Sequence, residues 1–236
     1  GYKFDQCNDN GKIPWYETNA YSSNATLQSK MNTISSAYSE LSKSKSEYVQ
    51  FYMKNHEQIP TWIMIKVVNF STFIDVLHNS KTNVTHAICK LYSMYDDHNL
   101  PNVKLLIGSL HWLRRVRNSC AHNERVYCIH QTQARNNSAS GRILDPYYAQ
   151  LPTSYSRCTE KNIFDILIYF KYFLPKEEFA PMIMELKNML IELQNTLQPN
   201  AFDNVRGQMG IKNLNVLDTL IALPKSKIEY HKFDTL

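Results

Sequence analysis

The stretch from Leu105 to Arg125, L-L-I-G-S-L-H-W-L-R-R-V-R-N-S-C-A-H-N-E-R, decides the fold class of this 236-residue chain. Its apolar residues recur at intervals of three, four and seven: Leu105, Leu106, Leu110, Leu113 and Val116. This spacing places them along one stripe of an α-helix. The stretch is therefore predicted to be an amphipathic helix that packs its apolar side on a core.

The C-terminal end of this predicted helix is strongly basic. Four arginines lie around two further polar side chains: Arg114, Arg115, Arg117 and Arg125, with Asn118 and His122. Guanidinium groups are permanently charged and match phosphate geometry, and imidazole exchanges protons near neutral pH. The sequence therefore predicts an anion site here, although Arg114, Arg115 and Arg125 also fit a solvated helix face.

Helical spacing continues on both sides of this stretch. Thr26 can cap a helix with the apolar positions Leu27, Met31, Ile34, Tyr38 and Leu41. Pro60 opens the most apolar segment, 62–77, which is predicted to form the central core helix or pair, with Trp62 and Trp112 at core positions. Further helices are predicted at 44–54, 84–95, 162–174, 176–197 and 213–222.

Alternation typical of strands is almost absent, so the fold class is predicted to be all-α, a helical bundle. We expect one domain over residues 1–236. It comprises an N-terminal arm at 1–23, a long polar loop at 126–160 after the motif helix, C-terminal helices at 161–198 and a tail at 199–236.

Composition narrows the function classes. No run of eighteen uncharged apolar residues exists, because Lys66 interrupts the most apolar segment, and the five cysteines do not suggest a disulfide framework. We therefore expect a cytoplasmic protein with no membrane span and no cofactor. The net charge of +5 is compatible with a polyanionic partner without demanding one.

Three ordered segments carry a family resemblance: S-K-S-E-Y-V-Q-F-Y-M (44–53), I-P-T-W-I-M-I-K-V-V-N-F-S-T-F (59–73) and L-R-R-V-R-N-S-C-A-H-N-E-R-V-Y (113–127). They resemble the Abi family of abortive-infection proteins, of the AbiD and AbiF type. Within the third segment, Arg117-x4-His122 with Asn118 after the arginine is similar to the HEPN ribonuclease motif. The likeness begins in what is the middle of a family member, so we expect an N-terminal helical portion to be missing.

The resemblance implies a HEPN-like bundle and a homodimer in which two motif helices form one composite active site. An interval of five residues rotates a regular helix by roughly 140°, so Arg117 and His122 are not expected to share a face within one chain. The family pattern A-H-H-x-R, followed by an aromatic residue and Asn, is matched at Arg125 and departed from at Asn123 and Cys128.

Metal-independent RNA cleavage requires deprotonation of the 2′-hydroxyl and stabilisation of the charged phosphorane. His122 is the candidate for proton transfer, Arg117 for phosphate binding and Asn118 for a hydrogen bond to the substrate or to His122. In the structural alternative, Arg117 pairs with Glu124 and His122 ends the helix, where a cation is favourable.

The polar loop offers further candidates for RNA binding. Arg135 and Arg142 are interleaved with Tyr147 and Tyr148, and tyrosine rings can stack on unpaired bases while arginines hold phosphates. The same tyrosines equally fit a role in seating the loop on the bundle. A zinc site formed by Cys120, His122, Cys128 and His130 is a further alternative, with unusual spacing.

The leading hypothesis is a phage-defence toxin: an endoribonuclease that cuts RNA through 2′-hydroxyl attack and is controlled by a cognate antitoxin, either a protein or a small noncoding RNA. The second hypothesis is a catalytically inactive RNA-binding module of the same fold. A third is a structural helical partner that binds no RNA.

Overall fold

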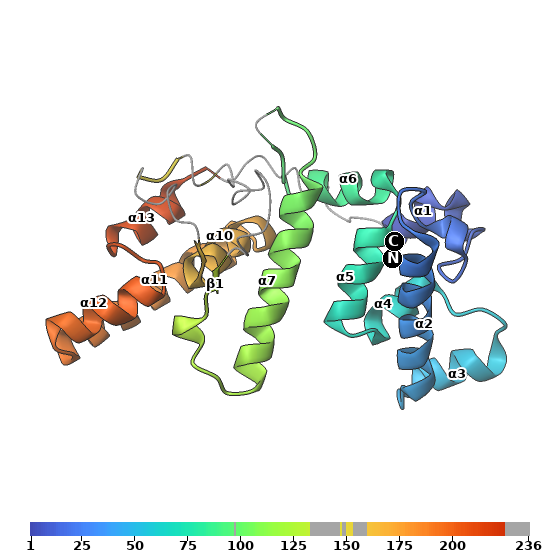
Figure 1. The fold of residues 1–236 in the computed structure, drawn as a ribbon, viewed down its shortest axis with the longest axis horizontal. Helices are drawn as coiled ribbons and strands as arrows, with labels where there is room; N and C mark the ends of the chain where they lie inside the picture. The colour runs from blue at the N-terminus through green and yellow to red at the C-terminus, as the bar shows by residue number, and fades with distance from the viewer. Residues whose placement is uncertain (97, 133–146, 148–149, 153–159, 225–236) are drawn as a thin grey trace. The chain divides into compact units, whose positions relative to one another are not determined.

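The computed structural model describes residues 1–96, 98–132, 147, 150–152 and 160–224 (Figure 1). These residues are helical apart from turns, connecting segments, isolated bridges and one two-residue ladder, which confirms the predicted all-α class. The chain divides into two compact units, Gly1–Lys90 and Leu91–Leu236. Each unit is described separately below, and the single domain over 1–236 stays a prediction.

Unit 1 consists of short helices around a common core. In chain order they are α1 (Tyr2–Cys7), the 3-10 turns η1 (Asp9–Gly11) and η2 (Thr18–Ala20), α2 (Leu27–Lys43), α3 (Glu47–Asn55), α4 (Thr61–Val67), α5 (Phe70–Asn79) and α6 (Thr82–Leu91). The predicted arm at 1–23 is thus partly helical. It is fixed because Phe4, Trp15 and Tyr21 are buried and the Trp15 Nε1–H donates to the Ile59 carbonyl at 2.8 Å.

The most apolar segment forms a helix pair, α4 and α5, one of the two predicted forms. The break is at Asn69, whose side-chain oxygen accepts hydrogen bonds from the backbone of Ser71 (2.8 Å) and Thr72 (3.0 Å). Glu40 of α2 accepts from the Asn69 amide at 2.7 Å and from the Thr72 hydroxyl at 2.5 Å. The cap therefore both starts α5 and attaches it to α2.

The core-facing side of α2 differs from the predicted stripe. Thr26 caps the helix as predicted, by accepting from the Ser29 N–H at 3.2 Å, and Leu41 is buried. The other buried positions are the small residues Thr33 and Ala37, whereas Leu27, Met31 and Tyr38 are exposed. Small side chains allow α5 to approach α2 closely, which hydrophobic spacing alone does not reveal. Trp62 is likewise not a core residue, because 43% of its surface is exposed.

Unit 2 is built around a fully buried helix. Its elements are α7 (Val103–Ala121), η3 (Val126–Cys128), β1 (Gln131–Thr132), β2 (Glu160–Lys161), α10 (Ile163–Phe173), α11 (Lys176–Thr196), α12 (Pro199–Gln208) and α13 (Asn215–Ala222). α10 is buried on almost every side and lies beside α7 and α11 (Figure 1). In the predicted tail at 199–236, the sequence pattern predicted the helix that forms α13 but not α12. β1 and β2 pair antiparallel, with Gln131 opposite Lys161.

The N-terminus of α10 is a junction between α7 and the C-terminal helices. The Asn162 side chain accepts from the Phe164 N–H at 3.0 Å, and its carbonyl accepts from the Trp112 Nε1–H of α7 at 3.0 Å. Gly210, with φ +79°, lies so close that a Cβ atom there would be 2.2 Å from the Asn162 side chain. These contacts fix Lys161, the residue before Asn162, relative to α7.

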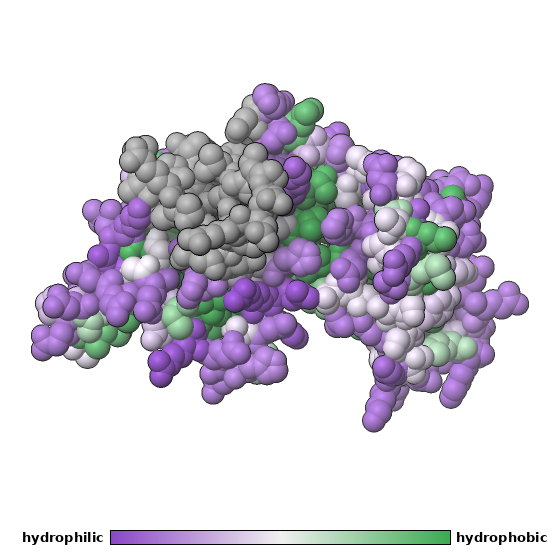
Figure 2. All heavy atoms as spheres, viewed as in Figure 1, coloured by the Kyte–Doolittle hydropathy of each residue, from purple (hydrophilic) through white to green (hydrophobic). Residues whose placement is uncertain are grey.

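The surface is mainly polar. On the face drawn in Figure 2, hydrophilic residues cover most of the described area and hydrophobic ones form smaller patches. Among the residues that the structure describes, no helix has the length and apolar character required to cross a membrane.

Candidate functional site: a basic cleft along α7

The last turn of α7 ends in a closed cap at His122. The Asn123 N–H donates to the Cys120 carbonyl at 3.2 Å, and the Glu124 N–H donates to the Ser119 carbonyl at 2.9 Å. Asn123 has φ +58°, the left-handed conformation that completes this type of helix end and that asparagine tolerates. The cap therefore fixes the backbone of His122 and turns the chain immediately after it.

An open cleft of about 580 Å³ lies along α7 in unit 2. The described residues that line it are Gly108, His111, Trp112, Arg114, Arg115, Asn118, Ser119, His122, Glu124 and Lys161. Most of the α7 members recur at intervals of three or four residues, so they share one face of the helix. Its volume lies in the range of small-molecule and cofactor sites.

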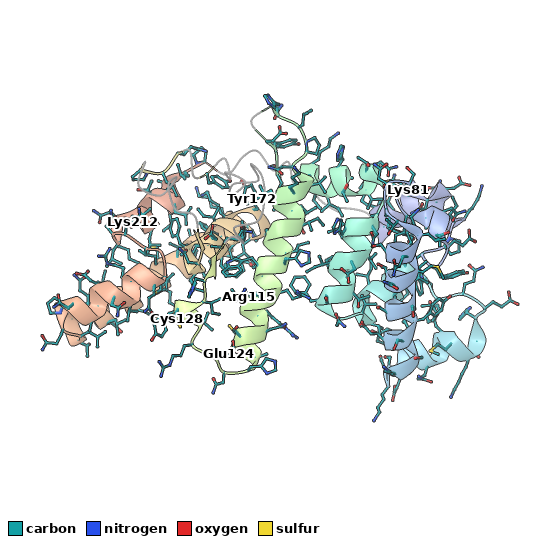
Figure 3. The ribbon with its side chains drawn as sticks, in the orientation of Figure 1. Lys81, Arg115, Glu124, Cys128, Tyr172 and Lys212 are labelled. Atoms are coloured by element: carbon teal, nitrogen blue, oxygen red, sulfur yellow. The ribbon has the colours of Figure 1, made fainter. Side chains whose placement is uncertain are left out.

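Positive charge predominates in this cleft. Among the described lining residues are the cations Arg114, Arg115 and Lys161 and a single carboxylate, Glu124. Figure 3 shows Arg115 partway along α7 and Glu124 just beyond the end of the helix. The Arg115 guanidinium lies 5.6 Å from the centre of the buried Trp112 ring, a cation–π contact that helps to position it. The cleft thus has the charge of an anion site.

The predicted catalytic residues are divided between two sides of α7. His122 and Asn118 line the cleft, together with Arg114 and Arg115. Arg117 is exposed, is not among the described lining residues and donates from Nη1 to the Asn118 side-chain oxygen at 3.1 Å. The alternative ion pair between Arg117 and Glu124 is not formed. One chain therefore presents His122 and Asn118 to the cleft, with Arg117 directed elsewhere.

Of the other predicted RNA-binding residues, the two that the structure describes, Arg125 and Tyr147, do not line this cleft. Arg125 is exposed at the start of η3. Tyr147 is 3% exposed, packs against Tyr172 with the ring centres 4.9 Å apart, and lies 5.4 Å from the Lys171 ammonium. Because its ring is enclosed, it serves the core of unit 2 and offers no face to a base. The remaining candidates, Arg135, Arg142 and Tyr148, lie outside the described residues.

Three titratable lining residues, His111, Glu124 and Lys161, were not predicted as site residues from the sequence. His111 and Glu124 flank the motif, and His111 lies eleven residues before His122, which is three helical turns and hence the same face. That spacing was a usable signal. Lys161 had no such signal, because it is 39 positions from His122 in sequence and reaches the cleft only through the β1–β2 ladder and the Trp112–Asn162 hydrogen bond.

The proposed zinc ligands do not assemble in the described part of the chain. No group of three or more His, Cys, Asp or Glu side chains in it comes close enough to hold a metal. Cys128 Sγ instead donates to the Arg125 carbonyl at 3.2 Å, and Cys120 is an exposed free thiol.

Comparison with known proteins gives one match. A family model described as Abi-like protein matches residues 2–128, more than half of the chain, including all but the first residue of unit 1 and all of α7. No curated protein and no solved structure matches the chain.

Proposed function

Because the chain belongs to the Abi-like protein family, we propose that it acts in abortive infection as an AbiD/AbiF-type toxin, a HEPN-type endoribonuclease. The observation that carries this proposal is the cleft itself, in which His122 and Asn118 lie among three cations. An RNA phosphate requires positive charge, and the 2′-hydroxyl next to it requires a base. The cleft supplies both kinds of group.

The mechanism follows from the chemistry of these residues. His122 takes the proton of the 2′-hydroxyl, whose oxygen then attacks the adjacent phosphorus. Asn118 donates a hydrogen bond to an oxygen of the phosphorane, and Arg114, one turn before Asn118, stabilises its extra charge. The bond to the 5′-oxygen breaks, and this oxygen takes a proton from a water molecule to which His122 returns the proton, leaving a 2′,3′-cyclic phosphate and a 5′-hydroxyl. The one carboxylate in the described lining, Glu124, is a poor ligand set for Mg²⁺, and we expect the reaction to need no metal.

The position of Arg117 supports a homodimer. Its guanidinium is permanently charged and suits a phosphate, yet it does not line the cleft of its own chain. In a two-fold dimer of α7 helices, Arg117 of one subunit approaches the phosphate held beside His122 of the other. We further propose that this toxin acts in the cytoplasm and is held inactive by a cognate protein or small noncoding RNA.

The decisive experiment compares the purified protein with His122→Ala on mixed cellular RNA in EDTA. We expect only the unmodified protein to cleave and its fragments to end in 2′,3′-cyclic phosphate. His130→Ala is the matched control, since it removes an exposed imidazole that does not line the cleft, and it should cleave normally.

The same experiment distinguishes the binding-module alternative. Retained RNA affinity without cleavage by any form of the protein, in a sample free of inhibitory RNA, would favour a module that binds RNA and does not cut it. Equal cleavage by His122→Ala and the unmodified protein would exclude the proposed role of His122.

A further inference from the structure

The cleft extends along α7 beyond what one phosphate needs. Gly108, Arg115 and His122 follow one another at seven-residue intervals on the same face, so neighbouring members are about 10.5 Å apart along the helix axis. Asn118 and His111 lie between them. A single reacting phosphate at His122 therefore leaves the part of the cleft near Gly108 unused.

That distant part is itself built to hold an anion. Gly108 has no side chain, and a Cβ atom there would lie only 3.7 Å from Lys161 Nζ, so the ammonium lies directly over the bare helix backbone. The backbone of Lys161 is held at two places. Lys161 pairs with Gln131 in the β1–β2 ladder, and the carbonyl of the next residue, Asn162, accepts the 3.0 Å hydrogen bond from Trp112. Lys161 is thus a second cationic position, separate from the reacting end of the cleft.

The lining favours contact with a nucleic-acid backbone over contact with bases. Trp112, the aromatic residue among the described lining, is 1% exposed, and Arg115 lies over its ring. Trp112 therefore offers no face for base stacking, and the remaining side chains of the described lining are charged or hydrogen-bonding. The described lining follows one face of α7, so its cations form a single line of contacts, which suits one nucleic-acid strand.

We propose that the cleft holds the sugar–phosphate backbone of single-stranded RNA along α7, with the scissile phosphate at His122 and neighbouring phosphates at Arg115 and Lys161. This inference rests on the proposed function and adds the substrate class and a length requirement. Recognition is independent of base sequence, and a dinucleotide is a poor substrate because it does not reach Arg115 and Lys161.

Cleavage of a length series of single-stranded oligonucleotides tests the length requirement. We expect kcat/KM to rise at least about tenfold from a dinucleotide to a pentanucleotide, as phosphate contacts accumulate. In Lys161→Ala and in Arg115→Ala, most of this gain should be lost, so that kcat/KM rises little between the dinucleotide and the pentanucleotide. Lys12→Ala removes the same charge from unit 1, where Lys12 pairs only with Asp9 at 3.5 Å, and should behave like the unmodified protein.

Binding provides a readout that does not depend on catalysis. The probe is a fluorescent, uncleavable 2′-O-methyl pentanucleotide, titrated by anisotropy at several salt concentrations. Loss of one phosphate contact lowers the slope of log affinity against log salt by about 0.7 for single strands, and we expect this change in Lys161→Ala but not in Lys12→Ala.

The outcomes separate the two proposals. Cleavage whose dependence on length is unaffected by Lys161→Ala and Arg115→Ala would overturn this inference and leave the ribonuclease proposal intact. Length-dependent binding that these variants weaken, without any cleavage, would support the inference and refute the ribonuclease proposal. Tighter binding of duplex than of single-stranded RNA would overturn the inference.

Discussion

At the scale of single residues, Asn123 controls the geometry at His122. It occupies the left-handed conformation at φ +58°, one position after His122, where the family pattern has a second histidine. A β-branched residue is strained there by about 1–2 kcal/mol, whereas glycine is not. We therefore expect Asn123→Val to lower the free energy of unfolding by that amount in urea denaturation and Asn123→Gly to leave it almost unchanged.

The same pair of variants tests whether the helix end matters for activity. If the cap positions His122 for proton transfer, Asn123→Val should reduce RNA cleavage more than Asn123→Gly at temperatures where both are folded. Equal activity of the two variants would show that His122 does not depend on this turn.

Two cysteines differ sharply in environment and should differ in reactivity. Cys120 is exposed at the end of α7, whereas Cys89 in α6 is fully buried, and burial raises the pKa of its thiol from 9.0 to about 11. Thiolate is the reactive form, so iodoacetamide should label Cys120 in the folded protein and leave Cys89 unlabelled even when the pH is raised from 8 to 10. Mass spectrometry of the labelled peptides measures both sites in one sample.

Unfolding is the control for this experiment, because both cysteines should then react at similar rates. Rapid labelling of Cys89 in the folded protein at pH 8 would contradict the burial that the structure assigns to it.

At the scale of elements, local sequence patterns predicted the helices better than they predicted the contacts between helices. The cap at Thr26, the apolar run of α4 and α5 and the spacing in α7 are all visible in the sequence. The buried face of α2 was not, because Thr33 and Ala37 are buried through close approach of α5 and not through hydrophobicity. Packing of this kind depends on the partner helix, which local spacing does not specify.

In the candidate site, too, local patterns predicted some features and long-range contacts determined others. Asn118 and His122 were found because they belong to one contiguous motif, and the shared face of α7 follows from helical geometry. Lys161 reaches the cleft only after α10 is docked against α7, and Tyr147 proved to be enclosed by Tyr172 and Lys171. Long-range contacts determined both outcomes, which explains why the sequence pattern alone did not predict them.

The junction at the start of α10 gives a prediction for the element that carries Lys161. At Gly210, φ is +79° and a Cβ atom would overlap the Asn162 side chain, so alanine is both strained and sterically excluded. Gly210→Ala should therefore lower the free energy of unfolding by about 2 kcal/mol or more, measured by urea denaturation. Gly207→Ala, three positions earlier in α12 with open space around its Cβ, should be neutral or slightly stabilising.

RNA binding tests whether the contact between Gly210 and Asn162 affects the cleft. A folded fraction of Gly210→Ala should also bind the uncleavable pentanucleotide less tightly, since Lys161 directly precedes Asn162. A variant as stable as the unmodified protein would refute the steric argument.

At the scale of the whole molecule, the net charge underestimates the positive electrostatic potential in the cleft along α7. The chain carries +5 overall, while three cations and one carboxylate gather in the cleft along α7. Local concentration of charge steers a polyanion more effectively than a diffuse excess does. Binding should therefore depend steeply on salt even though the protein is only mildly basic.

The proposed dimer makes a prediction about mixed subunits, because Arg117 and His122 lie on different sides of α7. Arg117→Ala and His122→Ala homodimers each lack one essential group and should be nearly inactive. Mixed dimers keep one copy of each. In an equimolar mixture half of the dimers are mixed, so RNA cleavage should recover to at most about one quarter of the unmodified level.

Co-refolding of the two variants from denaturant, followed by the cleavage assay, makes this measurement. Mixing the folded proteins without refolding is the control, since subunits that do not exchange cannot complement one another. Activity that stays at the sum of the two parents after refolding would show that each chain cleaves alone. Arg117 would then act through its hydrogen bond to Asn118, within the chain that carries it.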